Sequence, residues 1–340
     1  MAMLSSLEER RRKSRNILLT AFILLIVLWV FKLSYPQYSI VRAYTDSASA
    51  PAAITAPKQE EEDNVSPGRQ YKSRPNADLS LISDVFNGTI TNKAAVIIET
   101  RFRTNLIPLI LHFGSVLGPS WPIIIYTSVE AIGLFAASSA LARYIKSGTV
   151  EVRILPQTVL FTNSDSVNEF MTTSWLWENL APAEHILLFQ SDSMLCANAA
   201  RSVDDFFKYD FVGAPIATDL GKGYNGGLSL RKRSSILRVL EEWDWETTKG
   251  EDDRFEDQWY YNRLVKLQRT ESSEGIEPEA EGAINLPSME VARTFSVETI
   301  DYPHPLGVHQ VHRWLKTQMV SLDEWCPEYK LCSKDHIVDT

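Results

Sequence analysis

Cysteine is scarce in this sequence, with three residues in a chain of 340. So few thiols exclude a small fold that is held together mainly by disulfides. Cys326 and Cys332 are close enough in sequence to close a small loop through a bridge, and Cys196 is interpreted as a buried thiol.

The sequence also lacks an excess of basic residues. The formal net charge is −9, whereas a general nucleic-acid binder presents positive charge to the phosphates. Neither the GxxxxGK phosphate loop, ending in Ser or Thr, nor the zinc-binding HExxH pattern occurs. What the chain does have is 44% hydrophobic residues, enough for a substantial core in one large domain or two small ones.

One long apolar run, Ile17–Phe31, follows a basic cluster within residues 1–15. Its length is about the minimum for a helix that spans a bilayer. Because the positive charge lies on its N-terminal side, we expect a cytosolic tail at 1–15, a transmembrane signal anchor at 16–34 and type II topology. A cleaved signal peptide is the alternative, but no small-residue cleavage site follows promptly.

The next stretch predicts a disordered stem over residues 35–85. It contains five prolines and the acidic run EEED, and it has no sustained hydrophobic period. Two acceptor sequons for N-glycosylation begin at Asn64 and Asn87, and they are meaningful only if this part of the chain is luminal.

From Ala94 onward, short apolar runs alternate with helical patterns, which predicts βαβ units and a parallel sheet within a domain at 86–340. Capping-box spacings begin at Thr127 and Ser166. An exposed acidic loop is expected at 271–285. The expected strands are 94–98, 121–126, 151–155, 186–189, 209–215 and a last one near 294–297. The expected helices are 105–116, 127–146, 166–177, 202–207, 234–243 and a segment ending near 267.

Polar residues follow two of these strands abruptly. Glu99 and Arg101 come after the first strand, and Gln190, Ser191 and Asp192 come after the strand at 186–189. Ligands of open α/β sheets bind beyond the carboxyl ends of the strands, so these groups are candidates for chemistry. The simpler interpretation of Asp192 is a cap for the following turn.

Three further stretches carry candidate residues. The pair Gly226–Gly227 lets the backbone approach a ligand, or else forms a hairpin turn. Glu256 and Asp257 precede aromatic residues, whose apolar surroundings would raise a carboxyl pKa toward that of a general base. The simpler interpretation is that the two carboxylates are a solvated helix start, stabilised by the helix dipole. Three histidines, including His309, lie in the proline-containing segment 302–314, which is expected to be a loop.

Carboxylates and an imidazole at strand ends are suitable ligands for Mg²⁺ or Mn²⁺. Such an ion offsets the charge of a diphosphate as it leaves, which fits a nucleotide-sugar donor.

Seven segments, taken in order, resemble an uncharacterised family of glycosyltransferase-like proteins in a type II membrane form. They span about residues 90–315 and read AAVIIETR, WPIIIYTS, HILLFQSDSML, YDFVGAPI, NGGLSLR, EDQWYY and PLGVH. The resemblance implies a GT-A-like, Rossmann-like fold with a mostly parallel central sheet flanked by helices. It also implies a luminal enzyme that transfers a sugar from a nucleotide donor.

The resemblance further implies roles for individual residues. Asp257 is the preferred base with Glu256 beside it, although Asp252 and Asp253 leave that choice open. The implied metal ligands are Asp192 and His309. Gln190 stands where related enzymes have the first Asp of an Asp-x-Asp motif, and this weaker ligand leaves metal dependence open. The implied donor-binding residues are Glu99, Arg101, Gln190, Ser191, Ser193, Asn225, Gly226 and Gly227.

The leading hypothesis is therefore a single-pass glycosyltransferase of the Golgi membrane, with a glycan or glycoconjugate acceptor and no nucleic-acid partner. One alternative is a catalytically inactive sugar- or nucleotide-binding protein on the same fold, which the change at Gln190 motivates. Another is a phosphotransferase that uses the same metal and phosphate chemistry.

The sequons give a direct test of the topology. In a eukaryotic host we expect the wild-type chain to show a glycosidase-sensitive mass shift, because sequons are modified only in the lumen. The Asn64→Gln plus Asn87→Gln variant should lose that shift, as measured by mass spectrometry before and after glycosidase treatment. A wild-type chain without any shift would remove the main support for a luminal domain.

Overall fold

The computed structural model describes residues 90–250, 253–278, 280–317 and 319–332. The predicted tail, anchor and stem lie outside these residues, as do both sequons. Among the residues described, no helix is both long and apolar enough to cross a bilayer.

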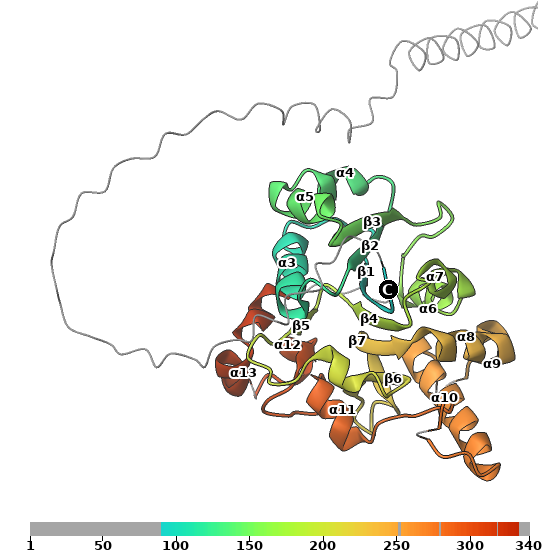
Figure 1. Cartoon of the computed structure of the whole chain (residues 1–340). Helices are drawn as coiled ribbons and strands as arrows, with labels where there is room; N and C mark the ends of the chain where they lie inside the picture. Colours follow the sequence, from blue (N-terminus) through green and yellow to red (C-terminus); the bar gives the residue numbers. More distant parts are fainter. Residues whose placement is uncertain (1–89, 251–252, 279, 318, 333–340) are drawn as a thin grey trace, which may run out of the picture. The chain divides into compact units, whose positions relative to one another are not determined.

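The centre of the fold is a six-stranded sheet with the strand order β3-β2-β1-β4-β7-β6 (Figure 1). The first four strands of this order are mutually parallel, and β7 runs antiparallel to both β4 and β6. The prediction of an α/β fold with a mostly parallel sheet is therefore confirmed. The strands are β1 Lys93–Ile98, β2 Ile123–Thr127, β3 Val150–Ile154, β4 His185–Phe189, β6 Phe211–Pro215 and β7 Tyr224–Lys232.

The inner strands form where the sequence has continuous apolar runs. Val96 of β1 lies between Ile124 of β2 and Leu188 of β4, and all three side chains are buried. Strands covered by helices on both faces need apolar side chains at every position, rather than at alternate ones. Because β1 and β4 are parallel neighbours, their carboxyl ends lie side by side at one edge of the sheet.

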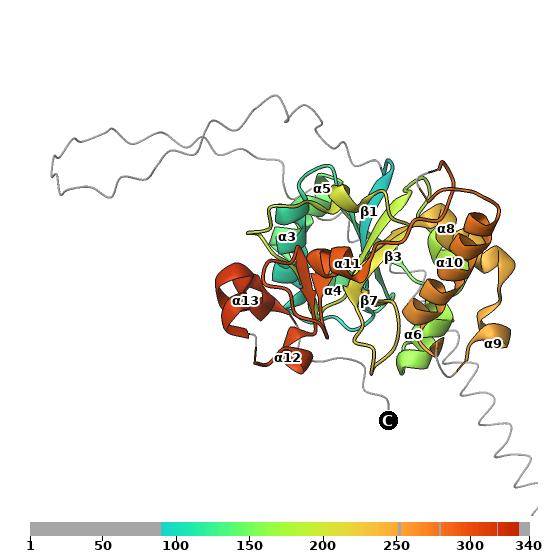
Figure 2. The same cartoon turned by 90° about the horizontal axis from the view of Figure 1, so that it is seen from below.

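Helices cover both faces of the sheet. In both views α3 and α5 lie on one side, whereas α6, α8 and α10 lie on the other (Figures 1 and 2). The helices that flank the sheet are α3 Leu106–Leu117, α4 Ile132–Ala136, α5 Ser139–Lys146, α6 Ser164–Met171, α7 Ser174–Asn179, α8 Arg233–Glu242, α9 Trp245–Thr248, α10 Glu256–Ser273 and α11 Met289–Phe295. A 3₁₀ turn, η2, spans Val203–Phe206 where a short helix was expected.

The single helix predicted over 127–146 is wrong, because this stretch forms α4 and α5. Thr127 does not cap a helix; it ends β2, where its hydroxyl donates a hydrogen bond to the Glu99 carbonyl at 2.7 Å. The cap of α5 is Ser138, whose Oγ accepts from the Leu141 amide at 3.3 Å.

Two other local expectations also change. The cap of α6 is Asn163, whose side chain accepts from the Ser166 amide at 3.0 Å, so Ser166 stands in the first turn and does not begin the helix. The acidic segment 271–285 is not wholly an exposed loop, since α10 continues through its first residues. Glu271 is buried there and pairs with Arg238 at 2.5 Å.

A second, three-stranded sheet lies next to the main one, with the order β5-β9-β8. Strand β9 is antiparallel to β5 and parallel to β8. The segment 302–314 is therefore not simply a loop. The strand expected near 294–297 is confirmed only in its second half, which is β8, whereas its first half is the end of α11. The elements here are β5 Ser193–Leu195, β8 Ser296–Val297, β9 Gly307–His309 and α12 Val311–Trp314.

A disulfide between Cys196 and Cys326 connects the end of β5 to the end of α13, Met319–Trp325. The interpretation of Cys196 as a thiol and of Cys326–Cys332 as the bridge is wrong, because the fold brings together residues that are 130 positions apart. Cys332 follows the 3₁₀ turn η4, Pro327–Leu331, and is the free, buried cysteine. Burial raises the pKa of its thiol.

The cysteine pairing predicts effects of different size on stability for two substitutions. Cys196→Ser should lower the free energy of unfolding by about 2–5 kcal/mol, because the bridge closes a long loop. Cys332→Ser should have a much smaller effect. Urea unfolding of both variants and peptide mapping without reduction measure this, and a mapped Cys326–Cys332 peptide would contradict the pairing.

Candidate functional site

A cavity of about 390 Å³ opens at the carboxyl ends of β1 and β4. It is bounded by both of these strands, by Asn225–Gly227 of β7, by the start of α10 and by the end of β9. Eleven of the twelve residues predicted from the sequence line it: Glu99, Arg101, Gln190, Ser191, Asp192, Asn225, Gly226, Gly227, Glu256, Asp257 and His309.

The twelfth, Ser193, is buried at the start of β5 and does not line the cavity. Its hydroxyl donates to the Gln190 carbonyl at 2.8 Å and thereby closes the turn that carries Ser191 and Asp192. His304 also lies away from the cavity, with its ring against Trp325. His309 is thus the histidine of segment 302–314 that faces the site.

At the end of β1, Glu99 and Arg101 form a compact pair. The Glu99 Oε1 atom accepts the Arg101 amide at 2.9 Å and lies 3.3 Å from the guanidinium Nε. The Arg101 side chain is still substantially exposed. This end of the cavity therefore presents one positive charge that is only partly neutralised.

Asp192 is held by two hydrogen bonds from Gln310, the residue that follows β9. Its Oδ2 atom accepts from the Gln310 side-chain amide at 2.9 Å, and its carbonyl accepts from the Gln310 backbone amide at 3.0 Å. Gln310 has a φ of +44°, a left-handed conformation that is uncommon outside glycine. Such backbone strain is typical of functional sites, where it persists because surrounding contacts fix it.

His309 lies between two buried carboxylates. Its Nε2 atom is 3.3 Å from Asp192 Oδ1, and its Nδ1 atom is 3.3 Å from Glu298 Oε1. Burial alone would lower the pKa of His309, but the two carboxylates outweigh it and raise the pKa to about 10. In the same way, burial opposes but does not prevent the lowering of the Asp192 pKa by His309.

The two glycines do not form the hairpin turn that was the simpler interpretation, because they lie within β7. The β6–β7 register shifts at this point, which makes an irregularity of the kind often found near active sites. A Cβ atom on Gly226 would be 2.6 Å from Glu256 Oε1, and one on Gly227 would be 2.1 Å from His309 Nε2. The neighbouring side chains therefore leave no room for a Cβ atom at either position, and both positions require glycine.

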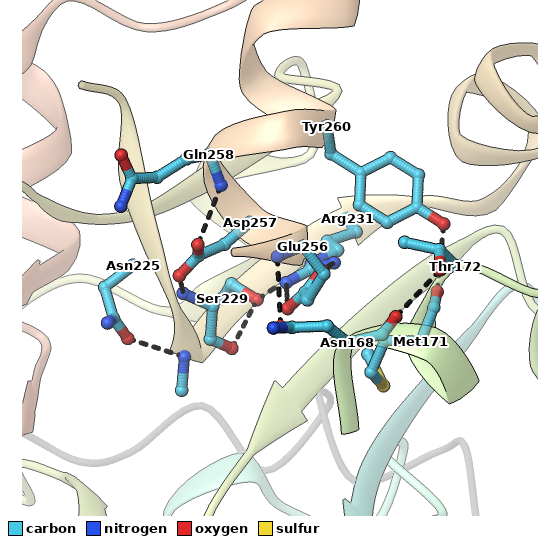
Figure 3. A network of polar contacts seen from close by, with 12 residues as sticks. Asn168, Met171, Thr172, Asn225, Ser229, Arg231, Glu256, Asp257, Gln258 and Tyr260 are labelled. Atoms are coloured by element: carbon cyan, nitrogen blue, oxygen red, sulfur yellow. Dashed lines mark hydrogen bonds and ion pairs between the residues drawn. The ribbon is translucent and has the colours of Figure 1, made fainter. Parts of the chain in front are cut away.

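Glu256 is committed to an ion pair. Both of its carboxylate oxygens bind the guanidinium of Arg231, at 2.6 and 2.8 Å, and Arg231 is fully buried (Figure 3). The ring of Phe211 lies 4.8 Å from that guanidinium and covers it. Because a buried arginine without its carboxylate is strongly destabilising, Arg231 needs Glu256 as its partner.

Asp257 lies next to this pair and has no comparable partner. Its Oδ2 atom accepts the Gly226 amide at 2.8 Å, and its Oδ1 atom accepts the Gln258 amide at 2.7 Å (Figure 3). Burial first, and then the charge of Glu256, raise its pKa to about 7, against the smaller effects of these amides and of Arg231. A carboxyl group with this pKa can take or give a proton near neutral pH.

Several lining residues were not predicted from the sequence. Arg254 and Arg313 stand exposed at the cavity, and neither has a carboxylate partner in the part of the chain that the structure describes. Phe161, Val167 and Met171 add an apolar wall. A basic residue inside the acidic run GEDDRFED was a visible signal for Arg254, whereas nothing local marked the others.

Asp192 and His309 fit a divalent cation. Asp192 Oδ1 and both ring nitrogens of His309 are buried and make no hydrogen bond within the described residues, only the 3.3 Å ion-pair contacts that join His309 to Asp192 and Glu298. One carboxylate and one imidazole suit Mn²⁺ better than Mg²⁺, which prefers oxygen. No group of three or more His, Cys, Asp or Glu side chains that could hold a metal occurs in that part of the chain. Remaining ligands would therefore come from phosphate and water.

Residues 149–309, less than half of the chain, match the family model described as "Protein of unknown function (DUF5672)". A search of curated proteins finds no match. Similar solved structures include the glycosyltransferase GlyE of Streptococcus pneumoniae TIGR4, with 14% identity and a TM-score of 0.34 over 73% of this chain and 66% of that one. This chain thus covers just under two thirds of GlyE.

Another similar structure is a glycosyltransferase involved in the glycosylation of the major capsid of PBCV-1. It has 12% identity and a TM-score of 0.36 over 69% of this chain and 100% of that one.

The raised pKa of Asp257 predicts a pH-dependent loss of stability. Between pH 4 and 7 the folded chain keeps a proton on Asp257 that the unfolded chain releases, so the free energy of unfolding falls as pH rises through this window. The Asp257→Asn variant should lack this decline, which is at most about 1.4 kcal/mol per pH unit. Urea unfolding of both proteins across the window measures it, with Asp165→Asn as an exposed control. Parallel curves for wild type and Asp257→Asn would contradict the raised pKa.

Proposed function

We propose that the protein is a glycosyltransferase that moves a sugar from a nucleotide-sugar donor to a glycan or glycoconjugate acceptor. It would act in the Golgi lumen, held at the membrane by the N-terminal type II anchor. The proposed topology and compartment rest on the basic tail and apolar run in the sequence.

One observation carries the proposal: a single cavity joins a carboxyl group that titrates near neutral pH to a buried carboxylate–imidazole pair. The first is Asp257, with a pKa of about 7. The second is Asp192 with His309, whose facing atoms are 3.3 Å apart. Sugar transfer needs both a base for the acceptor and positive charge for the leaving diphosphate.

In this reaction the acceptor oxygen forms a bond to the anomeric carbon of the donor. The bond from that carbon to the diphosphate oxygen breaks, and its electron pair leaves with the nucleoside diphosphate. The acceptor hydroxyl proton passes to the carboxylate of Asp257, which is half ionised near pH 7. We assign the base to Asp257 because both oxygens of Glu256 are bound to the Arg231 guanidinium, whereas those of Asp257 accept only from backbone amides.

The leaving diphosphate needs positive charge in the cavity. Arg101, Arg254 and Arg313 supply guanidinium groups from three separate segments, and guanidinium groups bind phosphate oxygens in a bidentate manner. A Mn²⁺ or Mg²⁺ ion held by Asp192 and His309 would offset further charge on the diphosphate. Gln190, in place of a carboxylate, leaves the proposed ion with a smaller protein ligand set.

The same change at Gln190 favours one other candidate function, a sugar- or nucleotide-binding protein without turnover. The two functions share the cavity and differ in whether the donor is cleaved. A transferase releases nucleoside diphosphate, whereas a binding protein retains the intact donor.

The deciding experiment is a nucleotide-sugar panel on the full-length protein in detergent, with Mn²⁺ or with EDTA, following nucleotide release in the presence of glycan acceptors. We expect release from one donor. Asp192→Ala should abolish it, and Asp257→Asn should reduce kcat by a factor on the order of 10²–10⁴, the usual contribution of a general base.

Arg143→Ala, on the exposed face of α5 away from the cavity, is the control and should behave as wild type. Wild-type turnover by Asp192→Ala would remove this residue from the site. Donor binding without release, across all donors and acceptors, would favour the binding protein.

A further inference from the structure

The three-stranded sheet places three ionisable side chains in a row. Its register pairs Ser193 of β5 with His309 of β9, and Val297 of β8 with Val308 of β9. Asp192 immediately precedes β5, and Glu298 immediately follows β8. The pairing therefore brings Asp192, His309 and Glu298 next to one another, although Glu298 is more than 100 positions from Asp192.

All three side chains are almost completely withdrawn from solvent. The exposed fractions are 5% for Asp192, 2% for His309 and 5% for Glu298. Asp192 and His309 line the cavity, whereas Glu298 lies behind the imidazole and does not. Glu298 contacts the ring at Nδ1, the nitrogen on the side opposite Asp192, at a distance of 3.3 Å.

The backbone beside Glu298 is fixed by hydrogen bonds to the segment that ends β6. The Thr299 hydroxyl accepts the Ala217 amide at 2.9 Å and donates to the Pro215 carbonyl at 3.1 Å. These bonds attach the end of β8 to the end of β6. A buried carboxylate is costly unless it is paired, and His309 is the charged partner that the structure records for Glu298.

We propose that Glu298 is a positioning residue that holds the His309 ring with Nε2 turned toward Asp192 and the cavity. A cation at Nε2 would replace the proton on that nitrogen, and the remaining Nδ1–H would then donate to Glu298, which fixes both the ring orientation and the tautomer. Gly227 completes the arrangement, since any Cβ there would displace the ring. The inference rests on the proposed function, because it takes the donor's divalent cation as the species that Nε2 meets.

The test measures the affinity of the full-length protein for Mn²⁺ alone, by titration with detection of free Mn²⁺ by electron paramagnetic resonance. Glu298→Ala should bind Mn²⁺ about 10–100-fold more weakly than wild type, the usual effect of losing such a carboxylate. Glu298→Gln keeps an acceptor oxygen for Nδ1, so its affinity should lie closer to wild type than that of Glu298→Ala.

Glu271→Gln is the matched control, because Glu271 is also a buried, ion-paired carboxylate but lies on α10 away from the cavity. Its Mn²⁺ affinity should be unchanged even where stability falls. Thermal unfolding of each variant reports folding. If Glu298→Ala does not fold, Glu298→Met, which fills a similar volume without an acceptor, takes its place.

The inference is overturned if the Ala or Met variant binds Mn²⁺ as tightly as wild type, or if Glu298→Gln binds as weakly as they do. It is also overturned if wild type binds no better than Asp192→Ala. Nucleotide release by wild type tests the proposed function separately. Glu298-dependent Mn²⁺ binding without release from any donor would leave the positioning role intact and reject the transferase.

Discussion

The buried ion pair between Arg231 and Glu256 joins the centre of the sheet to the first turn of α10. Arg231 comes from β7, is fully buried and lies among aromatic rings, so it needs the carboxylate that Glu256 supplies. The pair therefore fixes where α10 begins. Asp257, the next residue along the helix, is in turn fixed against the Gly226 amide. The position of Asp257, the candidate base, therefore depends on the Arg231–Glu256 ion pair, which lies deeper in the molecule than the cavity.

The same pair separates the roles of two adjacent carboxylates. Glu256 is neutralised by a guanidinium, whereas Asp257 is buried with no cation in direct contact and feels the charge of Glu256. Because burial and the charge of Glu256 raise the pKa of Asp257 to about 7, Asp257 is the member of this pair suited to accept a proton. At His309 the effect of burial is the reverse, because burial would lower the pKa of the ring, but the two neighbouring carboxylates raise it.

Much of the site could be predicted because parallel strands end at one edge of a sheet. The apolar runs of β1 and β4 stop at Glu99 and Gln190, so their polar residues had to meet. Glu298 and Gln310 could not be predicted in the same way, since β8 and β9 are two and three residues long and their pairing depends on the packing of the whole domain. The disulfide was missed for a similar reason, because closeness in sequence says little about which thiols the fold brings together. The break between α4 and α5 has no proline or glycine to mark it.

Gly226 and Gly227 connect the two halves of the site. Successive residues of a strand face opposite sides of the sheet. Gly226 accordingly lies against Glu256 and Asp257 of α10, while Gly227 lies against His309 of β9. Removing both side chains lets a helix and a second sheet approach the same short piece of backbone from opposite sides. A donor lying along this backbone would have the proposed base on one side and the proposed cation ligands on the other, so this short piece of β7 would set the distance between the two.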